Sequence, residues 1–164
     1  MLHAWLLRPR VAEWWGPAES VDELRAGYLL GADRPNATRA FIANLASKPV
    51  GFIQCYVVKG SGDGWWEDET DPGARGIDQF LAEASQLGQG LGSSMIHAFV
   101  SELLDDPAVS VVQTDPNPLN TRAIRCYKRV GFREVGLTNT PDGQALLMRC
   151  TRQSLGRDAE PSSS

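Results

Sequence analysis

Residues 86–92 read Gln86-Leu87-Gly88-Gln89-Gly90-Leu91-Gly92, with three glycines at every second position between an apolar segment and a strongly helical one. Glycine lets a loop pass close to a ligand with its N–H groups turned inward, and the start of the following helix adds a positive dipole. Together these features favour a binding site for a pyrophosphate. Taken alone, the segment is equally compatible with an ordinary turn from a strand into a helix.

A second motif follows at residues 120–132, which read Asn-Thr-Arg-Ala-Ile-Arg-Cys-Tyr-Lys-Arg-Val-Gly-Phe. Its spacing predicts a helix over 120–130, with arginines on the outer side and Gly131 as the natural stop. The inner side of this helix carries Ala123, Cys126, Tyr127 and Val130. The pair of motifs is more informative than either one alone.

The composition excludes several classes of protein. A chain of 164 residues is long enough for one domain with a single core. No window is apolar enough to span a membrane and the first residues lack the apolar core of a signal peptide, so we expect a cytoplasmic protein. The net charge of −4 argues against nucleic acid as a partner and favours a cationic one. Three scattered cysteines and two histidines suggest neither a disulfide framework nor a metal site, so no metal is expected.

The hydrophobic pattern predicts helices and strands in a definite order. Ser20-Val-Asp-Glu23 is a capping box that begins a helix through Leu29. The helix after the glycines, over 90–104, is expected to turn Leu91, Met95, Ala98 and Phe99 inward. The other expected elements are one short helix within 2–14, a hairpin of 40–46 and 50–58, a buried strand over 77–84, a strand over 109–114 and a closing hairpin of 132–140 and 144–151. We expect a single domain over 1–153 and a disordered tail over 154–164.

This order of elements and the two motifs resemble the GNAT superfamily of acyl-CoA-dependent N-acetyltransferases. The resemblance implies an α+β fold with a mixed, mostly antiparallel sheet flanked by helices, and acetyl-CoA as the cosubstrate with no metal. In that family the glycine-motif amides hold the CoA pyrophosphate, and the strand before them splays from its neighbour to bind the pantetheine arm. By position, Phe80, Leu81 and Ala82 would face pantetheine, while Gln89, Gly90, Gly92 and Ser93 would face pyrophosphate, and Asn120 is a further cofactor-binding candidate.

One departure concerns the start of the chain. Members of that family usually begin with a strand before the first helix, whereas Met1 already lies within the expected first helix. We therefore expect the family's first strand to be absent. An unpaired sheet edge invites association, so the expected state is a monomer or a weak homodimer.

The segment from Gly60 to Gln79 concentrates carboxylates beside Trp65 and Trp66. Carboxylates pair with ammonium groups and flat rings stack on the apolar faces of sugars, so the segment suits a polycationic, sugar-like ligand. The alternative is a solvated acidic loop whose tryptophans anchor the core. That alternative is favoured for the three adjacent carboxylates, Glu67, Asp68 and Glu69.

Residues 60–92, Thr114-Asp115-Pro116, the motif at 120–132 and Thr140-Pro141-Asp142-Gly143 together resemble the aminoglycoside 6′-N-acetyltransferases of the resistance type. The resemblance implies acetylation of the 6′-amine of an aminoglycoside antibiotic, with Asp78 as the base or amine-orienting group and Tyr127 as the general acid. The implied drug-binding residues are Asp63, Trp65, Trp66, Asp78, Asp115 and Asp142. Each of two of these residues also has a structural alternative. Asp115 could cap the turn before Pro116, and Tyr127 could be a core tyrosine on an amphipathic helix.

Two other functions stay open at this stage. One is an acetyltransferase of protein N-termini or of another small amine, which would share the CoA motifs without needing the carboxylate cluster. The other is a non-catalytic acyl-CoA-binding module, which would bind CoA without transferring a group. Asp78 and Tyr127 argue against the second.

Overall fold

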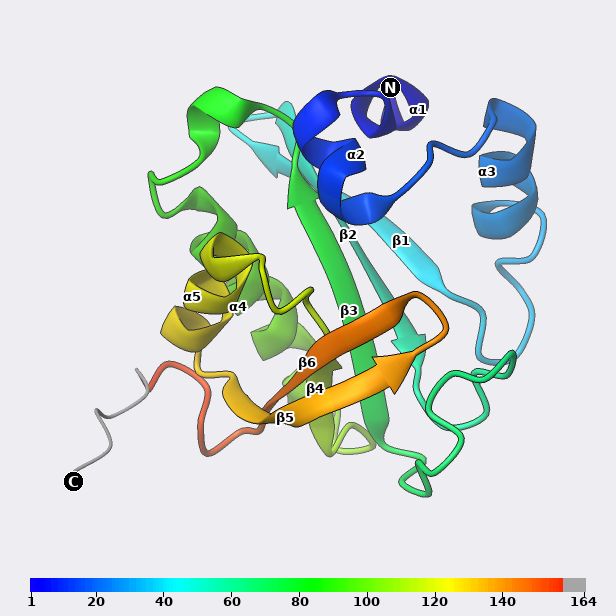
Figure 1. Ribbon diagram of the computed structural model, residues 1–164, viewed down its shortest axis with the longest axis vertical. Helices are drawn as coiled ribbons and strands as arrows, with labels where there is room; N and C mark the ends of the chain where they lie inside the picture. The colour runs from blue at the N-terminus through cyan, green and yellow to red at the C-terminus, as the bar shows by residue number, and fades with distance from the viewer. Residues whose placement is uncertain (158–164) are drawn as a thin grey trace.

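Six strands form one sheet in the order β1-β2-β3-β4-β6-β5 in the computed structural model, which describes residues 1–157 (Figure 1). Only β3 and β4 run parallel, and the other neighbouring pairs are antiparallel. The strands are β1 (Arg39–Leu45), β2 (Lys48–Val57), β3 (Ala74–Leu81), β4 (Val111–Thr114), β5 (Arg133–Thr140) and β6 (Gly143–Cys150). The expectation of a mixed, mostly antiparallel sheet is confirmed, and within residues 1–157 β1 is an edge strand with no strand before the first helix.

Helices cover both faces of this sheet. Neighbouring residues of a strand point to opposite faces, and accordingly Phe52 packs in the cluster with α1, while Ile53 packs in the larger core with α4 and α5. The helices on the first side are α1 (Leu2–Leu6), α2 (Pro9–Trp15) and α3 (Val21–Tyr28), and those on the second are α4 (Leu91–Asp105) and α5 (Thr121–Val130). A short 3₁₀ turn, η1 (Ala84–Gln86), lies between β3 and α4.

Two of the expected helices differ from the prediction. The single helix expected within 2–14 is two, because the residue before a proline avoids the helical region and Arg8, before Pro9, is extended with φ −69° and ψ 133°. In α4 the buried residues are Ile96, Val100 and Leu104, whereas Ala98 is exposed. The apolar residues of α4 surround much of the helix, so their spacing was compatible with more than one inward face.

The strand before the glycines also differs in its bounds. β3 begins at Ala74 and ends at Leu81, three residues earlier at each end than expected. Gly73 precedes the strand at a close approach of two segments, since a Cβ there would come within 2.7 Å of the Ser110 hydroxyl and 2.8 Å of the Ala108 carbonyl. Residues 82–90 then leave the sheet through η1 before α4 begins.

Residues 154–157, which were expected to belong to the disordered tail, contact the domain. Ser154 is buried, and the Gly156 N–H donates to the Val130 carbonyl at 2.8 Å. Gly131 ends α5 next to this segment, and its φ is +120°. A Cβ at Gly131 would lie 2.2 Å from the Ser154 carbonyl, so only glycine fits there. The rest of the predicted tail, 158–164, lies outside the described residues. Among residues 1–157 no helix is long and apolar enough to cross a bilayer.

Candidate active site

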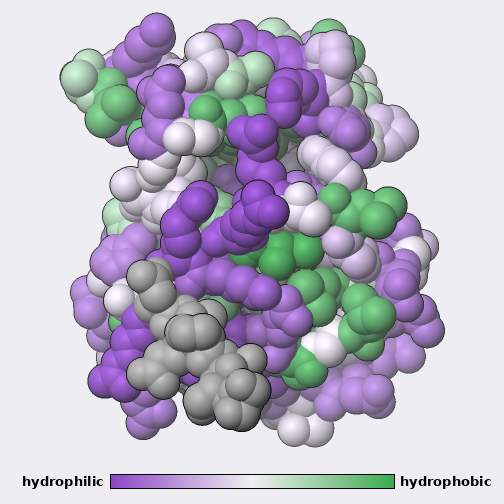
Figure 2. Space-filling view, turned by 60° about the vertical axis from the view of Figure 1, so that its left-hand side comes forward, coloured by the Kyte–Doolittle hydropathy of each residue, from purple (hydrophilic) through white to green (hydrophobic). Residues whose placement is uncertain are grey.

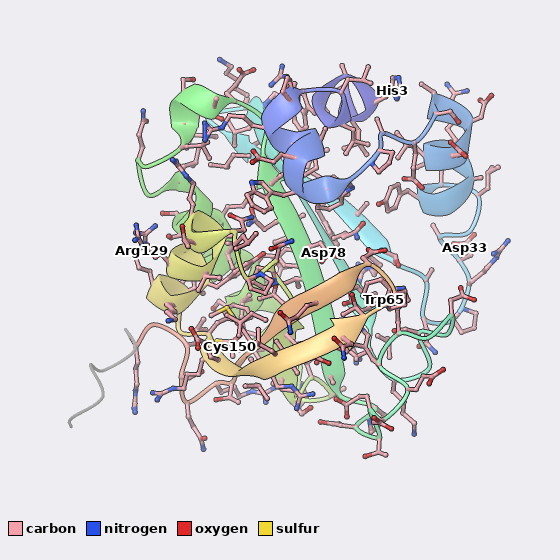
Figure 3. All side chains as sticks on the ribbon, viewed as in Figure 1. His3, Asp33, Trp65, Asp78, Arg129 and Cys150 are labelled. Atoms are coloured by element: carbon pink, nitrogen blue, oxygen red, sulfur yellow. The ribbon has the colours of Figure 1, made fainter. Side chains whose placement is uncertain are left out.

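β3 and β4 separate after a short parallel pairing. They pair only over Ala74–Gly76 and Val111–Gln113, whereas β3 continues along β2 to Leu81. The separation opens a cavity of about 570 Å³, which we call the splay cavity; it is lined by β3, by residues 114–123 and by α2, with Cys126 and Tyr127 of α5. Figure 2 shows this side of the molecule hollowed between its upper and lower parts, and Figure 3 places Asp78 on β3 near the middle of the molecule.

The backbone of β3 presents free polar groups to the splay cavity. The Ala82 N–H donates to the Val50 carbonyl, and the Ala74 carbonyl accepts from the Val58 N–H. An antiparallel ladder uses every second residue, so β2 engages the even-numbered residues of β3. Past the end of the β4 pairing, the N–H and C=O groups of Gln79 and Leu81 therefore face the opening, as an extended amide-containing ligand requires.

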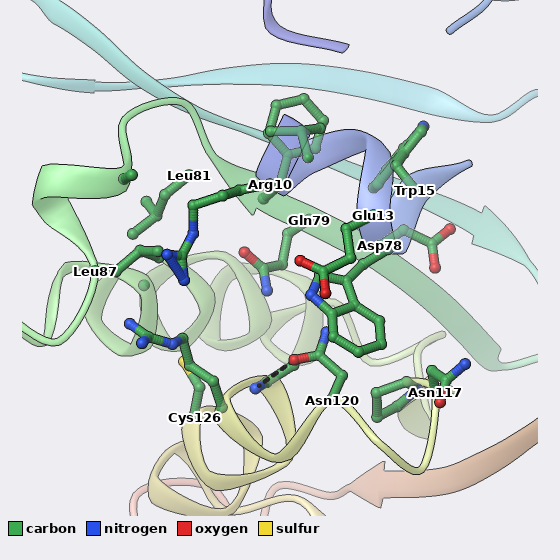
Figure 4. A pocket seen from close by; sticks show the side chains of 18 of the residues that line it. Arg10, Glu13, Trp15, Asp78, Gln79, Leu81, Leu87, Asn117, Asn120 and Cys126 are labelled. Atoms are coloured by element: carbon green, nitrogen blue, oxygen red, sulfur yellow. Dashed lines mark hydrogen bonds between the residues drawn. The ribbon is translucent and has the colours of Figure 1, made fainter. Parts of the chain in front are cut away.

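The three residues predicted to face pantetheine differ from one another in how they meet the splay cavity. Leu81 offers both its backbone and its side chain to the cavity (Figure 4). Phe80 also lines the cavity, but its ring stacks on Phe52 at 5.4 Å in the aromatic cluster under α1 and α2. The backbone of Ala82 is engaged within the protein, because its carbonyl accepts a hydrogen bond from Arg8 while its N–H bonds to β2.

Two residues of the glycine segment, Leu87 and Gly92, line one end of the splay cavity. The predicted pyrophosphate residues Gln89, Gly90 and Ser93 lie beside that end but are not among the lining residues of either cavity. Gly88 and Gly90 both have φ +77°, a left-handed conformation that favours glycine, and Gly90 is the N-cap of α4. The first N–H groups of an α-helix have no partner within the helix, so the start of α4 carries donors and a positive dipole. Gly92 lies against Leu81 and Cys126 in the first turn of α4.

The polar side chains near the glycine segment have specific partners. Gln89 is exposed and donates to the Ser85 carbonyl at 2.8 Å, while the Ser93 hydroxyl accepts from Arg129 at 3.2 Å. Asn120 caps α5 by accepting from the Ala123 N–H at 3.2 Å, and it lines the splay cavity. Arg10 reaches into the cavity from α2 and lies near Leu87 in Figure 4, so a cation also faces this end.

A second, larger cavity of about 730 Å³ adjoins the first. We call it the acidic cavity, since Glu19, Asp78, Asp115 and Asp142 line it and Lys59 is the one lysine or arginine among its described lining residues. The two cavities share the residues Trp14, Trp15, Asp78, Asp115 and Asn117. Asp78 therefore lies where a ligand in the acidic cavity meets a ligand in the splay cavity.

Asp78 is held by a short chain of hydrogen bonds. Gln54 lies directly opposite it on β2, and the Gln54 Nε2 group donates to Asp78 Oδ2 at 2.9 Å. The Tyr28 hydroxyl at the end of α3 in turn donates to Gln54 Oε1 at 2.5 Å. Burial raises the pKa of the Asp78 carboxyl and the nearby Asp142 adds to this, while the hydrogen bond from Gln54 opposes it. A raised pKa brings this carboxylate closer to the range of an efficient base near neutral pH.

Asp115 follows the end of β4 and is half-buried. Burial raises its pKa to about 8, and the neighbouring carboxylates of Asp78 and Asp142 add to the rise. Asp142 reaches the cavity from the two-residue turn between β5 and β6. Like charges so close to one another favour protonation, and a polycationic ligand relieves this repulsion.

Tyr127 lies on α5 with a buried ring and lines the splay cavity. The Gln79 Nε2 group donates to the Tyr127 hydroxyl at 3.4 Å. Burial raises the pKa of this phenol above its ordinary value, against the hydrogen bonds with Thr114 and Gln79. The phenol therefore keeps its proton at neutral pH, which a general acid requires.

The tryptophans line the acidic cavity and Asp63 does not. Trp65 and Trp66 are half-buried at 5.9 Å between ring centroids, outside the described core clusters. Asp63 is exposed, because Asp63 and Gly64 are the central residues of a tight turn with φ +54° and +84° that is closed by the Trp65 N–H to the Gly62 carbonyl. The structure therefore does not bring Asp63 to the site.

The other carboxylates of that acidic segment have structural partners or face solvent. Glu69 forms an ion pair with Arg149 at 2.8 Å. Asp71 accepts from the Gly73 N–H and the Ser110 hydroxyl, which fixes the turn before β3. Glu67 and Asp68 are exposed. The solvated-loop interpretation of the adjacent carboxylates therefore describes Glu67 and Asp68, and Glu69 has a structural role.

Several residues of the site were not predicted from the sequence. Gln54, Tyr28 and Gln79 contact Asp78 or Tyr127 directly or through one another. A weak signal existed for Gln54, because it is a polar residue between the apolar residues Ile53 and Cys55 of its strand. Tyr28 gave no such signal, since an amphipathic helix accounts for it equally well.

The comparisons with known proteins agree with this geometry. The family described as "Acetyltransferase (GNAT) domain" matches residues 1–140, and the chain belongs to this family. Within it, the chain is 49% identical over 160 residues to "Aminoglycoside N(6')-acetyltransferase type 1" of Klebsiella pneumoniae, covering 96% of this chain and 80% of the relative. It is 58% identical over 93 residues to "Kanamycin resistance protein" of Rhizobium radiobacter, covering 57% of this chain and 86% of that protein.

A solved structure gives the same result in three dimensions. The crystal structure of the aminoglycoside acetyltransferase AAC(6')-Ib in complex with coenzyme A and kanamycin superposes with a TM-score of 0.88 at 49% identity, covering 94% of this chain and 89% of that one. The expected GNAT fold is thereby confirmed.

Proposed function

We propose that this chain transfers the acetyl group of acetyl-CoA to the 6′-amine of aminoglycoside antibiotics and thereby confers resistance to them. The observation that carries the proposal is that Asp78 belongs to both cavities. A base at that point touches the amine of a sugar ligand on one side and faces the acyl donor on the other. The names of the similar proteins support the same substrate and the same donor.

The splay cavity fits acetyl-CoA. Free backbone groups of Gln79 and Leu81 suit the amides of a pantetheine arm, and the start of α4 at Gly90 suits a pyrophosphate. Acetyl-CoA supplies an activated acetyl group as a thioester. Among residues 1–157 no group of three or more His, Cys, Asp or Glu side chains is arranged to hold a metal ion.

The acidic cavity fits a polycationic sugar. Asp115 and Asp142 offer carboxylates to ammonium groups, and Trp65 and Trp66 offer flat faces to sugar rings. An aminoglycoside amine is largely protonated at neutral pH, so it must lose a proton before it attacks. Asp78 accepts that proton, directly or through a water molecule, and orients the amine.

The transfer then balances in atoms and protons. The amine nitrogen forms a bond to the acetyl carbon, and the bond from that carbon to sulfur breaks. Tyr127 lies in the splay cavity and donates its proton to the leaving sulfur. The second proton, which the nitrogen loses as it becomes an amide, passes through solvent and restores the Tyr127 phenol, while the proton held by Asp78 is released to solvent. A backbone N–H of β3 beyond its pairing with β4 meets the oxyanion that develops on the acetyl oxygen.

The first experiment measures thiol release from acetyl-CoA with kanamycin, tobramycin, gentamicin and an N-terminal peptide offered separately. We expect release with the aminoglycosides and not with the peptide. A drug with a hydroxyl in place of the 6′-amine is the matched control, and it should be inert. Release with the peptide alone would establish the N-terminal acetyltransferase instead. CoA binding by the folded chain without release from any acceptor would establish the non-catalytic module.

A further inference from the structure

The contact between Gln54 and Asp78 is built by the register of the sheet. The two residues are direct partners across β2 and β3, so their side chains emerge on the same face. The Gln54 Nε2 group donates to Asp78 Oδ2 at 2.9 Å. The side-chain hydrogen bond that the structure shows for Asp78 thus involves Oδ2 alone, and Asp78 lines both cavities.

The Gln54 amide has a second partner that fixes its orientation. Its Oε1 atom accepts from the Tyr28 hydroxyl at 2.5 Å. Burial raises the pKa of Tyr28 to about 12, with Glu19 and Asp78 adding to the rise, so this hydroxyl is protonated throughout the neutral range. The Tyr28 ring is itself held edge-on against Phe52 at 5.8 Å. A flipped amide would turn its oxygen toward the carboxylate, which has only acceptors to offer when ionised.

We propose that Gln54 is a positioning residue for the acetyl transfer: it binds Oδ2 of Asp78 so that Oδ1 is left to accept from the substrate amine, and Tyr28 fixes the Gln54 amide in the orientation this requires. The inference rests on the proposed function and deepens it, since it assigns the orientation of the base to a side chain on another strand. Helix α3 is thereby linked to the reacting centre through Tyr28.

Gln54 also affects how readily Asp78 ionises. Its hydrogen bond favours the carboxylate, against burial and the nearby Asp142. Removing this donor should therefore raise the pKa of Asp78 and move the acidic limb of the kcat/KM profile to higher pH. The titratable groups that interact with Asp78 all remain in a variant of Gln54: Tyr28, Tyr56, Asp115, Tyr127 and Asp142. Other titratable groups that line the two cavities also remain, among them Arg8, Arg10, Glu13, Glu19, Lys59 and Cys126.

The test compares Gln54→Met, which keeps the length of the side chain without its donor, with the intact chain. We expect the acidic limb of the profile for an aminoglycoside to move up by about 1 pH unit, and kcat at pH 7 to fall about 10-fold. The KM for acetyl-CoA should not change. Gln153→Met is the matched control, because Gln153 is exposed and lines neither cavity, and its profile should equal that of the intact chain.

Tyr28→Phe keeps the inference testable if Gln54→Met does not fold, since it removes only the hydroxyl. It should shift the limb in the same direction by a smaller amount. A rise in drug KM with an unchanged kcat and an unchanged profile would show that Gln54 only contacts the ligand, and would overturn the inference. If the intact chain acetylates no aminoglycoside, the proposed function fails by itself, so the two failures are distinguishable.

Discussion

The polar groups proposed to hold acetyl-CoA are backbone groups of one stretch of chain, β3 and the glycine segment, whereas the acidic cavity offers side chains of several separate segments. At the donor end, left-handed glycines and a short β3–β4 pairing leave N–H and C=O groups free. At the drug end, Asp78, Asp115 and Asp142 come from β3, the end of β4 and the β5–β6 turn. The difference teaches that a backbone site can be recognised as a local motif, while a side-chain site depends on long-range packing.

The strongest test of this division is Asp78→Asn, because Asp78 belongs to both cavities. We expect kcat to fall about 10²- to 10⁴-fold, since the amide cannot accept the amine proton. The affinity for CoA should not change, because the donor end is held by backbone groups. Steady-state thiol release and calorimetry with CoA measure the two quantities.

Asp68→Asn is the control for that change, since Asp68 is an exposed carboxylate of the same acidic segment. It should leave both quantities unaltered. If Asp78→Asn retained a kcat close to that of the intact chain, the base would have to be another group, and Asp115 with its pKa of about 8 would be the first to examine.

Tyr127→Phe should have a smaller effect, a fall in kcat of about 10²-fold. A thiolate is a tolerable leaving group near neutral pH, because a thiol has an ordinary pKa of about 8.5 and needs less help than an amine that must lose a proton. An acetyl donor with a more acidic thiol should reduce the difference between the variant and the intact chain. An equal deficit with both donors would mean that Tyr127 is only a packed core tyrosine, the plain alternative considered from the sequence.

The same division explains what the sequence could predict. The glycine segment and the helix at 120–132 were recognised because their functional groups lie within short, continuous stretches. The strand pairing that sets Gln54 opposite Asp78 depends on the register of β2 and β3, which no local pattern specifies. The contact from Tyr28 depends in addition on where α3 packs.

The misplaced predictions have the same origin. Asp63 belongs to a segment with the right composition, yet a tight turn at Asp63 and Gly64 directs it into solvent. Ala98 was placed on the inner face of α4, where the sheet instead receives Ile96 and Val100. Composition and periodicity identified the segments, and packing selected the members that face the site and the core.

Gly90→Ala tests the donor end through the backbone alone. A Cβ at Gly90 would meet nothing within 4 Å, so the cost is that of a left-handed residue at φ +77°, about 1–2 kcal/mol. We expect the KM for acetyl-CoA to rise about 5- to 30-fold if the loop relaxes from its binding conformation, with the drug KM unchanged. Gly156→Ala is matched in φ, at +74°, and lies after β6, where its N–H donates to the Val130 carbonyl, rather than at the start of α4. It should lower the Tm without changing either KM. If the KM for acetyl-CoA were the same for the intact chain, Gly90→Ala and Gly156→Ala, the proposal that the backbone at Gly90 binds the pyrophosphate would be wrong.

The smallest expected effect concerns stability, and it arises because the acidic cavity gathers carboxylates for a ligand. The folded pKa of Asp115 is about 8, well above the value of about 3.9 in an unfolded chain. Between these values the folded state binds the proton more tightly than the unfolded state does. The free energy of unfolding therefore decreases as pH rises from about 4 to about 8.

Asp115→Asn removes that penalty and should make the ligand-free chain more stable at pH 8 by about 0.5–2 kcal/mol, or about 2–4 °C in Tm for each kcal/mol. The gain should vanish toward pH 4, where Asp115 is protonated in the folded chain and about half protonated in the unfolded one. The same change should raise the drug KM, since an ammonium loses its carboxylate. Thermal unfolding from pH 4 to pH 8 measures the first effect, and Asp33→Asn, at an exposed loop residue, is the control. A stability gain that is independent of pH would mean that the repulsion among Asp78, Asp115 and Asp142 is not its source. The carboxylates of the acidic cavity would then not destabilise the ligand-free chain.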